Sequence, residues 1–297
     1  MKYFLLVLSV VFATADSIFV NKFSKSLQKN FTDICVFECG VCAVAGTELF
    51  IMNAATGNRY SPSLYTVILG AIFGVVIASA QILTPKALET GPMSYTNLIG
   101  LCGMILPTFS GKIFWHEDIT AAQYVGIALM LLSFVLGVNP KKDKRMSVKW
   151  IIMCAFIFAL NGGMGIIQKI DQTSDYAQET TQCLVTAFIT ATLILLASAL
   201  IQHRRTPRTV SFKSMVPVLA AATGIGTGAV HIINMYLVGV MNSAFFFPAV
   251  NGATIMAITL ASVFVFREKL SKIQIFSLVL GTLAILLVGN ITDLFIK

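Results

Sequence analysis

The sequence predicts an all-α integral membrane protein with ten transmembrane helices, arranged as two inverted five-helix repeats around a central cavity. Three observations support this fold class: the composition, the regular spacing of apolar segments and an internal repeat. Of the 297 residues, 57% are hydrophobic and only 11% are charged, whereas soluble domains have roughly 25% charged residues. A soluble fold of this length cannot bury so much apolar surface, so the excess must face lipid.

Apolar segments recur along the whole chain. Crossing the hydrocarbon core takes about 20 largely apolar residues. Segments of this kind lie near 3–21, 33–52, 64–83, 92–113, 120–138, 150–168, 178–201, 214–238, 243–266 and 271–291. The longest connections, 139–149 and 202–213, leave no room for a soluble domain. Any chemistry must therefore take place within or between the helices.

The net charge of +8 comes from Lys and Arg in the connections, where they meet anionic lipid head groups and set orientation. A nucleic-acid partner is therefore not expected. Connections after the odd-numbered helices hold 16 of the 21 Lys and Arg residues. The positive-inside rule then places both termini outside.

An internal repeat relates the two halves of the chain. Residues 114–139 align with 265–290 at a constant shift of 151, and residues 2–22 align with 149–169 at a shift of 147. We therefore predict one five-helix repeat in 1–140 and a second in 147–297. Because five is odd, the second repeat enters the membrane from the opposite side, as in many secondary transporters.

The repeat also decides between two interpretations of the first segment. Ala13-Thr14-Ala15 has the small residues of a signal-peptide cleavage site, but a cleavable signal has no reason to resemble the internal segment 149–169. The apolar stretch also continues beyond that site, unlike a short signal region. We expect the segment to be retained as the first membrane helix, with Asp16 inside it.

The most specific sequence motif begins the last helix of each half: EDITAAQ at 117–123 and EKLSKIQ at 268–274. On these residues the chain resembles ten-helix members of the drug/metabolite transporter superfamily, which have two EamA-type repeats. The resemblance covers nearly the whole chain. It implies a central cavity lined mainly by helices 1, 3, 4, 6, 8 and 9, and transport of small metabolites or drugs. It also implies that both termini lie in the cytoplasm, which disagrees with the charge count, so the direction of transport stays open.

The same motif has a physical interpretation of its own. Thr120 with Gln123, and Ser271 with Gln274, have the spacing of capping boxes. The Glu that precedes each box is expected to interact with the positive end of the helix dipole. Glu117 and Glu268 are therefore predicted to be structural.

Ionisable side chains within the membrane cost roughly 2.5–3.5 kcal/mol on insertion scales and are candidates for function. Asp16 and Glu38 lie deepest, whereas Glu48 lies near the end of its segment, within reach of head groups. The repeat places Gly163 opposite Asp16, and this asymmetry favours a function. Asp16 either binds substrate, cation or proton, or is a hydrated acid near a helix end.

Polar residues line up on the eighth segment. Thr227, His231 and Asn234 form one stripe that follows Gly224-x-Gly226-x-Gly228, and Gln81 of the third segment follows Gly70-x-x-x-Gly74. Glycines at such spacing permit close helix approach. His231 either titrates near neutral pH or is a hydrogen-bonded packing residue. Further cavity candidates are Tyr95, Asn97, Asn161, Gln168, Phe247 and Asn251.

No metal site, cofactor or enzyme activity is predicted. The cysteines of ECGVC, at 39 and 42, lack the context of a redox or metal motif and are expected to be buried packing residues. Membrane aspartyl proteases need a second acid in a Gly-x-Gly-Asp context, which is missing. No Lys or Arg lies well inside a predicted span, so sugar-phosphate exchangers are a poor match.

The leading functional prediction is a secondary transporter of small organic metabolites, such as amino acids, that works by alternating access. The alternative is a proton-coupled exporter of cationic drugs, and a non-transport membrane protein or intramembrane enzyme is less favoured. The expected partners are a small-molecule substrate, the lipid bilayer and protons, and the protein is expected to be a monomer or homodimer. The expected location is the cytoplasmic (inner) membrane, as a multi-pass protein.

Overall fold

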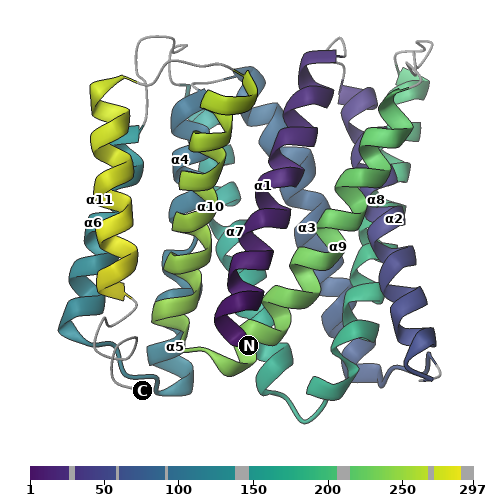
Figure 1. The fold of residues 1–297 in the computed structure, drawn as a ribbon. Coiled ribbons are helices and arrows are strands. Elements are labelled where there is room, and N and C mark those ends of the chain that lie inside the picture. Colours follow the sequence, from purple (N-terminus) through teal and green to yellow (C-terminus); the bar gives the residue numbers. More distant parts are fainter. Residues whose placement is uncertain are drawn as a thin grey trace. The chain divides into compact units, whose positions relative to one another are not determined.

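The computed structural model describes residues 1–26, 31–57, 60–90, 93–137, 147–205, 215–266 and 271–288, and these form helices without any strand. Figure 1 shows the helices in chain order. Their bounds are α1 (Lys2–Ser26), α2 (Phe31–Ala55), α3 (Leu64–Thr90), α4 (Met93–Cys102), α5 (Ile105–Trp115), α6 (Ala121–Gly137), α7 (Val148–Thr173), the short η2 (Ala177–Glu179), α8 (Thr180–Arg205), α9 (Met215–Val240), α10 (Ser243–Phe266) and α11 (Lys272–Val288).

Among the described residues, seven helical segments are long and apolar enough to cross a membrane, and three further apolar segments are shorter. The predicted all-helical class is therefore confirmed for the described residues. The chain is compatible with a multi-pass membrane protein.

The helices gather into two compact units. Unit 1 comprises Met1–Thr14, Ala87–Ile166 and Val240–Lys297, and unit 2 comprises Ala15–Lys86 and Ile167–Gly239. Each unit therefore takes helices from both predicted repeats, 1–140 and 147–297. The helices α1 and α7 contribute to both units.

In unit 2, glycines bring helices together at two places. A Cβ at Gly70 would lie 2.6 Å from the Cys183 carbonyl oxygen, and one at Gly74 would lie 2.6 Å from Thr190 Cβ, so α3 packs closely on α8. A Cβ at Gly224 would lie 2.6 Å from Val44 Cβ, so α9 packs equally closely on α2. The predicted role of these small residues is confirmed.

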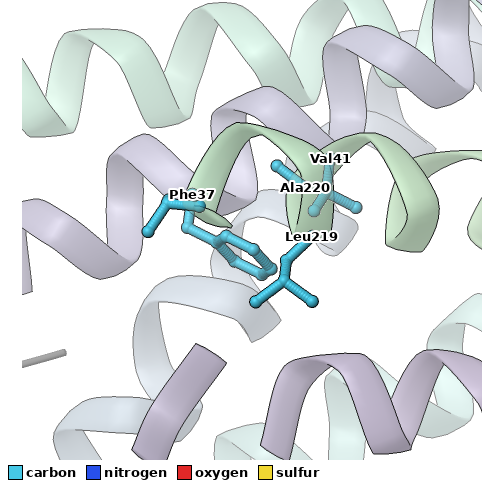
Figure 2. Packing of buried hydrophobic residues seen from close by; sticks show 5 residues of the cluster. Phe37, Val41, Leu219 and Ala220 are labelled. Atoms are coloured by element: carbon cyan, nitrogen blue, oxygen red, sulfur yellow. The ribbon is translucent and has the colours of Figure 1, made fainter. Parts of the chain in front are cut away.

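A buried apolar cluster fixes α9 against α2 in the same unit. It consists of Phe37, Val41, Val216, Leu219 and Ala220, with Phe19 packed against it. Figure 2 shows four of these side chains meeting between the two helices. Because Phe19 lies one turn after Asp16 on α1, this cluster sets the register of α1 along α9.

In unit 1, α6 and α11 form the main helix pair, and they lie side by side in Figure 1. Ser133 Oγ donates to the Ser277 carbonyl at 2.8 Å, and Ser277 Oγ donates to the Ser133 carbonyl at 2.8 Å. Each hydroxyl thus satisfies a polar group on the other helix. Gly126 faces Val288, where a Cβ would lie 2.7 Å from the Val288 Cγ2 atom.

Both predicted capping boxes are confirmed. Gln123 N donates to Thr120 Oγ1 at 3.3 Å and Thr120 N donates to Gln123 Oε1 at 3.0 Å. In the second box, Gln274 N donates to Ser271 Oγ at 3.3 Å and Ser271 N donates to Gln274 Oε1 at 2.9 Å.

The predicted partner of Glu117 needs correction. Its Oε2 atom accepts from Ser243 N at 2.8 Å, at the first residue of α10, and so it caps a different helix from the one it precedes. Glu268 lies outside the described residues. The structural role of Glu117 stands, but it joins two helices that are far apart in the sequence.

The fourth predicted span, 92–113, is not one continuous helix. It divides into α4 and α5 at Gly103 and Met104, whose amides bond three residues back, to the carbonyls of Gly100 and Leu101. Pro107 explains the break: it has no amide hydrogen to donate to Gly103, and its ring crowds the carbonyl four residues before it.

Candidate functional site

The carboxylate of Asp16 rests on the backbone of α9, within unit 2. Its Oδ2 atom accepts from Thr227 Oγ1 at 3.2 Å. Its Oδ1 atom occupies the space where any residue other than glycine at 226 would place its Cβ. This second oxygen is buried and has no hydrogen-bond partner among the described residues. Gly226 is thus required for the position of Asp16.

Two more acids lie near Asp16 in the same unit. Glu38 and Glu48 of α2 each interact electrostatically with Asp16. The Oε2 atom of Glu48 lies where a Cβ at Gly228 would be. It is buried and makes no hydrogen bond within the described residues. Glu48 therefore turns one carboxylate oxygen inward onto α9, while its side chain as a whole is half-buried.

The alternating glycines of α9 serve two neighbours. Gly224 and Gly228 are one turn apart and face α2, whereas Gly226 lies about 200° around the helix from Gly228, because each residue turns the helix by about 100°. Close packing on α2 needs only Gly224 and Gly228. Gly226 was therefore the signal in the sequence for a second contact, with Asp16.

Thr223 adds an unusual hydroxyl to this region. Its side chain is only 3% exposed, and its Oγ1 atom has no hydrogen-bond partner in the described part of the chain. Threonines in helices commonly donate to the carbonyl four residues earlier. Several here do so, among them Thr14, Thr47, Thr108, Thr186, Thr190 and Thr192. Thr223, which lies one turn before Thr227 on the same face of α9, makes no such bond within the described residues.

His231 lies among aromatic rings in unit 2. Phe73 of α3 and Phe188 of α8 meet its ring edge-on, at centroid distances of 5.8 and 5.3 Å. Its Nδ1 atom is buried and has no hydrogen-bond partner within the described ranges. Gln81 does not join it: Gln81 Oε1 accepts from Cys42 Sγ at 3.5 Å. The predicted polar stripe of α9 therefore divides, with Thr227 toward Asp16 and His231 toward aromatic rings.

A second polar cluster, at the end of α7, was not predicted from the sequence. The helix continues to Thr173 and carries Lys169, which is 5% exposed and donates to the Val238 carbonyl at 3.2 Å. Asp171, 1% exposed, accepts from Thr180 at 2.6 Å and from Gln172 at 3.2 Å. These contacts tie α7 to the ends of α8 and α9. The predicted span stopped at 168, so this pair was counted outside the membrane.

The remaining predicted site residues are dispersed. In unit 1, Asn161 donates to the Gly100 carbonyl at 3.1 Å, and Asn251 donates to the Phe247 carbonyl at 2.8 Å. Buried Phe247 also meets Phe246 edge-on at 5.0 Å. Within unit 2, Gln168 is buried and Asn234 is half-buried. The side chains of Tyr95 and Asn97 lie outside the described residues.

In the ranges that the structure describes, no group of three or more His, Cys, Asp or Glu side chains is arranged to hold a metal ion. The six cysteines are free, and Cys42 and Cys183 are fully buried. The polar groups gathered around Asp16 are carboxylates and hydroxyls.

No protein-family model and no curated protein matches the chain. A solved structure, described only as the crystal structure of a protein, is similar with a TM-score of 0.78. The similarity covers 100% of this chain and 99% of that one, at 12% sequence identity. At this identity the comparison shows a shared fold.

Proposed function

We propose that this protein is a secondary transporter that moves small organic metabolites, such as amino acids or related compounds, by alternating access. The observation that carries the proposal is the group formed by Asp16, Glu38 and Glu48 on apolar, membrane-length helices. Acids are expensive in such surroundings and usually mark a substrate, ion or proton path. Asp16 and Glu48 each keep a buried oxygen without a described hydrogen-bond partner.

Helix bounds support the ten-helix inverted repeat that belongs to this proposal. The helices α6 and α11 begin at Ala121 and Lys272, 151 residues apart, which is the shift seen in the sequence. The helices α4 and α5 together correspond to α10, and the three shorter apolar segments complete ten. Inverted repeats of this kind are the usual framework for alternating access.

The proposal is tested with proteoliposomes, a pooled panel of small metabolites and mass spectrometry. We expect at least one class of compound to move faster than in empty liposomes. Asp16→Asn should reduce that movement at least about tenfold, because a hydrogen bond to a charged group contributes roughly 1.5–3 kcal/mol. Asp175→Asn is the matched control, because Asp175 is exposed. Folded protein that moves nothing in the panel contradicts the proposal.

A second candidate is the proton-coupled export of cationic drugs. It is favoured by the sign of the charge, since the three neighbouring side chains of the site are all acidic. Movement of cationic dyes only under an imposed pH gradient, and its loss in Asp16→Asn, would favour this candidate. Movement of neutral or zwitterionic metabolites without a gradient would exclude it as the main function.

A further inference from the structure

Asp16 and Glu48 present the same contact from two helices. Each places one carboxylate oxygen directly on a glycine of α9, Asp16 on Gly226 and Glu48 on Gly228. Each of these oxygens is buried and has no hydrogen-bond donor among the described residues. A buried carboxylate oxygen without a donor is costly unless a positive charge binds to it.

A proton is the positive charge that needs the least space beside these two oxygens. The side of each oxygen that faces α9 is closed, because a Cβ at Gly226 or Gly228 would overlap it. Among the described residues, no group of three or more His, Cys, Asp or Glu side chains could hold a metal ion. A proton converts the carboxylate into a neutral group that also has a donor.

The two carboxylates act as separate sites. Gly226 and Gly228 face directions about 200° apart on α9, so one small ligand cannot touch both oxygens. The charged groups that interact with Asp16 are Glu38 and Glu48, both acidic. On α9 itself, His231 contacts phenylalanine rings. Lys86 of α3 lies 4.4 Å from the Phe31 ring, at the start of α2.

We propose that Glu48 is a second proton-binding carboxylate beside Asp16, so that two protons bind on opposite sides of the glycine segment of α9. Each proton is taken from water and forms one O–H bond on Asp16 Oδ1 or Glu48 Oε2. Both carboxylates become neutral while α9 stays between them. The role of these protons in a transport cycle rests on the proposed function, whereas the binding itself does not.

Infrared difference spectroscopy of the purified protein during a pH titration tests this without any substrate. The wild type should show two carbonyl bands of protonated carboxyl groups. Asp16→Asn should remove one band and Glu48→Gln the other. Glu179→Gln is the control and should remove neither, because the Glu179 carboxylate already accepts from Ser63 N at 2.8 Å and from Thr66 Oγ1 at 2.5 Å.

Gly228→Ala keeps the Glu48 carboxyl group and displaces it from α9, so it should shift the Glu48 band and leave the Asp16 band unchanged. This variant remains informative if Glu48→Gln fails to fold. A wild-type spectrum with one band, or two bands that survive Glu48→Gln, overturns the proposal. Two bands in a protein that transports nothing support proton binding and contradict only the proposed transport function.

Discussion

The two compact units use their polar side chains in different ways. In unit 1, the described hydrogen bonds of Ser133, Ser277 and Asn161 pair neutral groups with backbone carbonyls or with each other. In unit 2, Asp16 and Glu48 keep a buried oxygen without a described partner, and both lie against glycine. The buried side-chain oxygens without a described partner in unit 1 belong to neutral hydroxyls, those of Ser243 and Thr254. An incompletely paired buried charge costs more stability than a neutral group and persists where it is used. This difference is the reason why we propose ion or proton chemistry for unit 2 and not for unit 1.

The largest expected effect is on the packing of unit 2. In Gly74→Val, the added atoms would overlap the Ala187 carbonyl oxygen and Thr190 Cβ of α8, and relieving such overlap typically costs about 1–3 kcal/mol. Thermal unfolding in detergent should show this loss. Gly163→Ala in unit 1 is the matched control, since nothing lies within 4 Å of a Cβ there. An equal loss of stability in Gly74→Val and Gly163→Ala would contradict this difference between the two units.

A smaller effect on stability is expected from Gly226→Ala, which changes only the backbone position on which the Asp16 carboxylate lies. In Gly226→Ala the new methyl group displaces the end of a flexible side chain, so the unfolding temperature should stay close to the wild type. Transport should nevertheless fall about tenfold, which corresponds to roughly 1.4 kcal/mol, because Asp16 loses its position beside Thr227. Proteoliposome flux measures this change. Normal flux and a normal melting curve in Gly226→Ala would show that the contact between Asp16 and Gly226 has no function in transport.

The third prediction concerns a helix cap that each unit contains, in which a glutamate from another part of the chain accepts from a backbone amide at the helix start. Glu117 caps α10 in unit 1, and Glu179 accepts from Ser63 N just before α3 in unit 2. Losing a helix cap costs about 1 kcal/mol, so Glu117→Ala and Glu179→Ala should lower stability by similar amounts. Chemical denaturation of each variant tests the equality. A much larger effect on flux than on stability in Glu117→Ala would mean that unit 1 also has a functional acid.

The smallest effect is expected between α6 and α11. Interhelical hydrogen bonds in membranes average roughly 0.6 kcal/mol, so Ser133→Ala should cost about that much. The double variant with Ser277→Ala should show coupling, since the hydroxyls also lie 3.5 Å apart. A double-mutant cycle on the free energy of unfolding measures this coupling. Strict additivity would mean that the two bonds act independently.

The sequence alone determined the class of protein and much of its local structure. Composition and segment length predicted helices in lipid, and the residues of each capping box lie three apart, so their contacts follow from helix geometry without any tertiary information. The glycine spacings on α3 and α9 likewise predicted close helix contacts. The exception is local as well: the break at Pro107, which divides the fourth span into α4 and α5, was not predicted.

Only the tertiary structure decided which groups meet. Asp16 and Thr227 are 211 residues apart, and Glu117 caps a helix that begins 126 residues later. Helical periodicity defines the faces of one helix but leaves open which neighbour covers each face. The inward turn of Glu48 onto Gly228, and the burial of Lys169 beside the end of α9, therefore could not be derived from spacing. Such contacts depend on how closely glycines let the backbones approach, and that is settled when the helices pack.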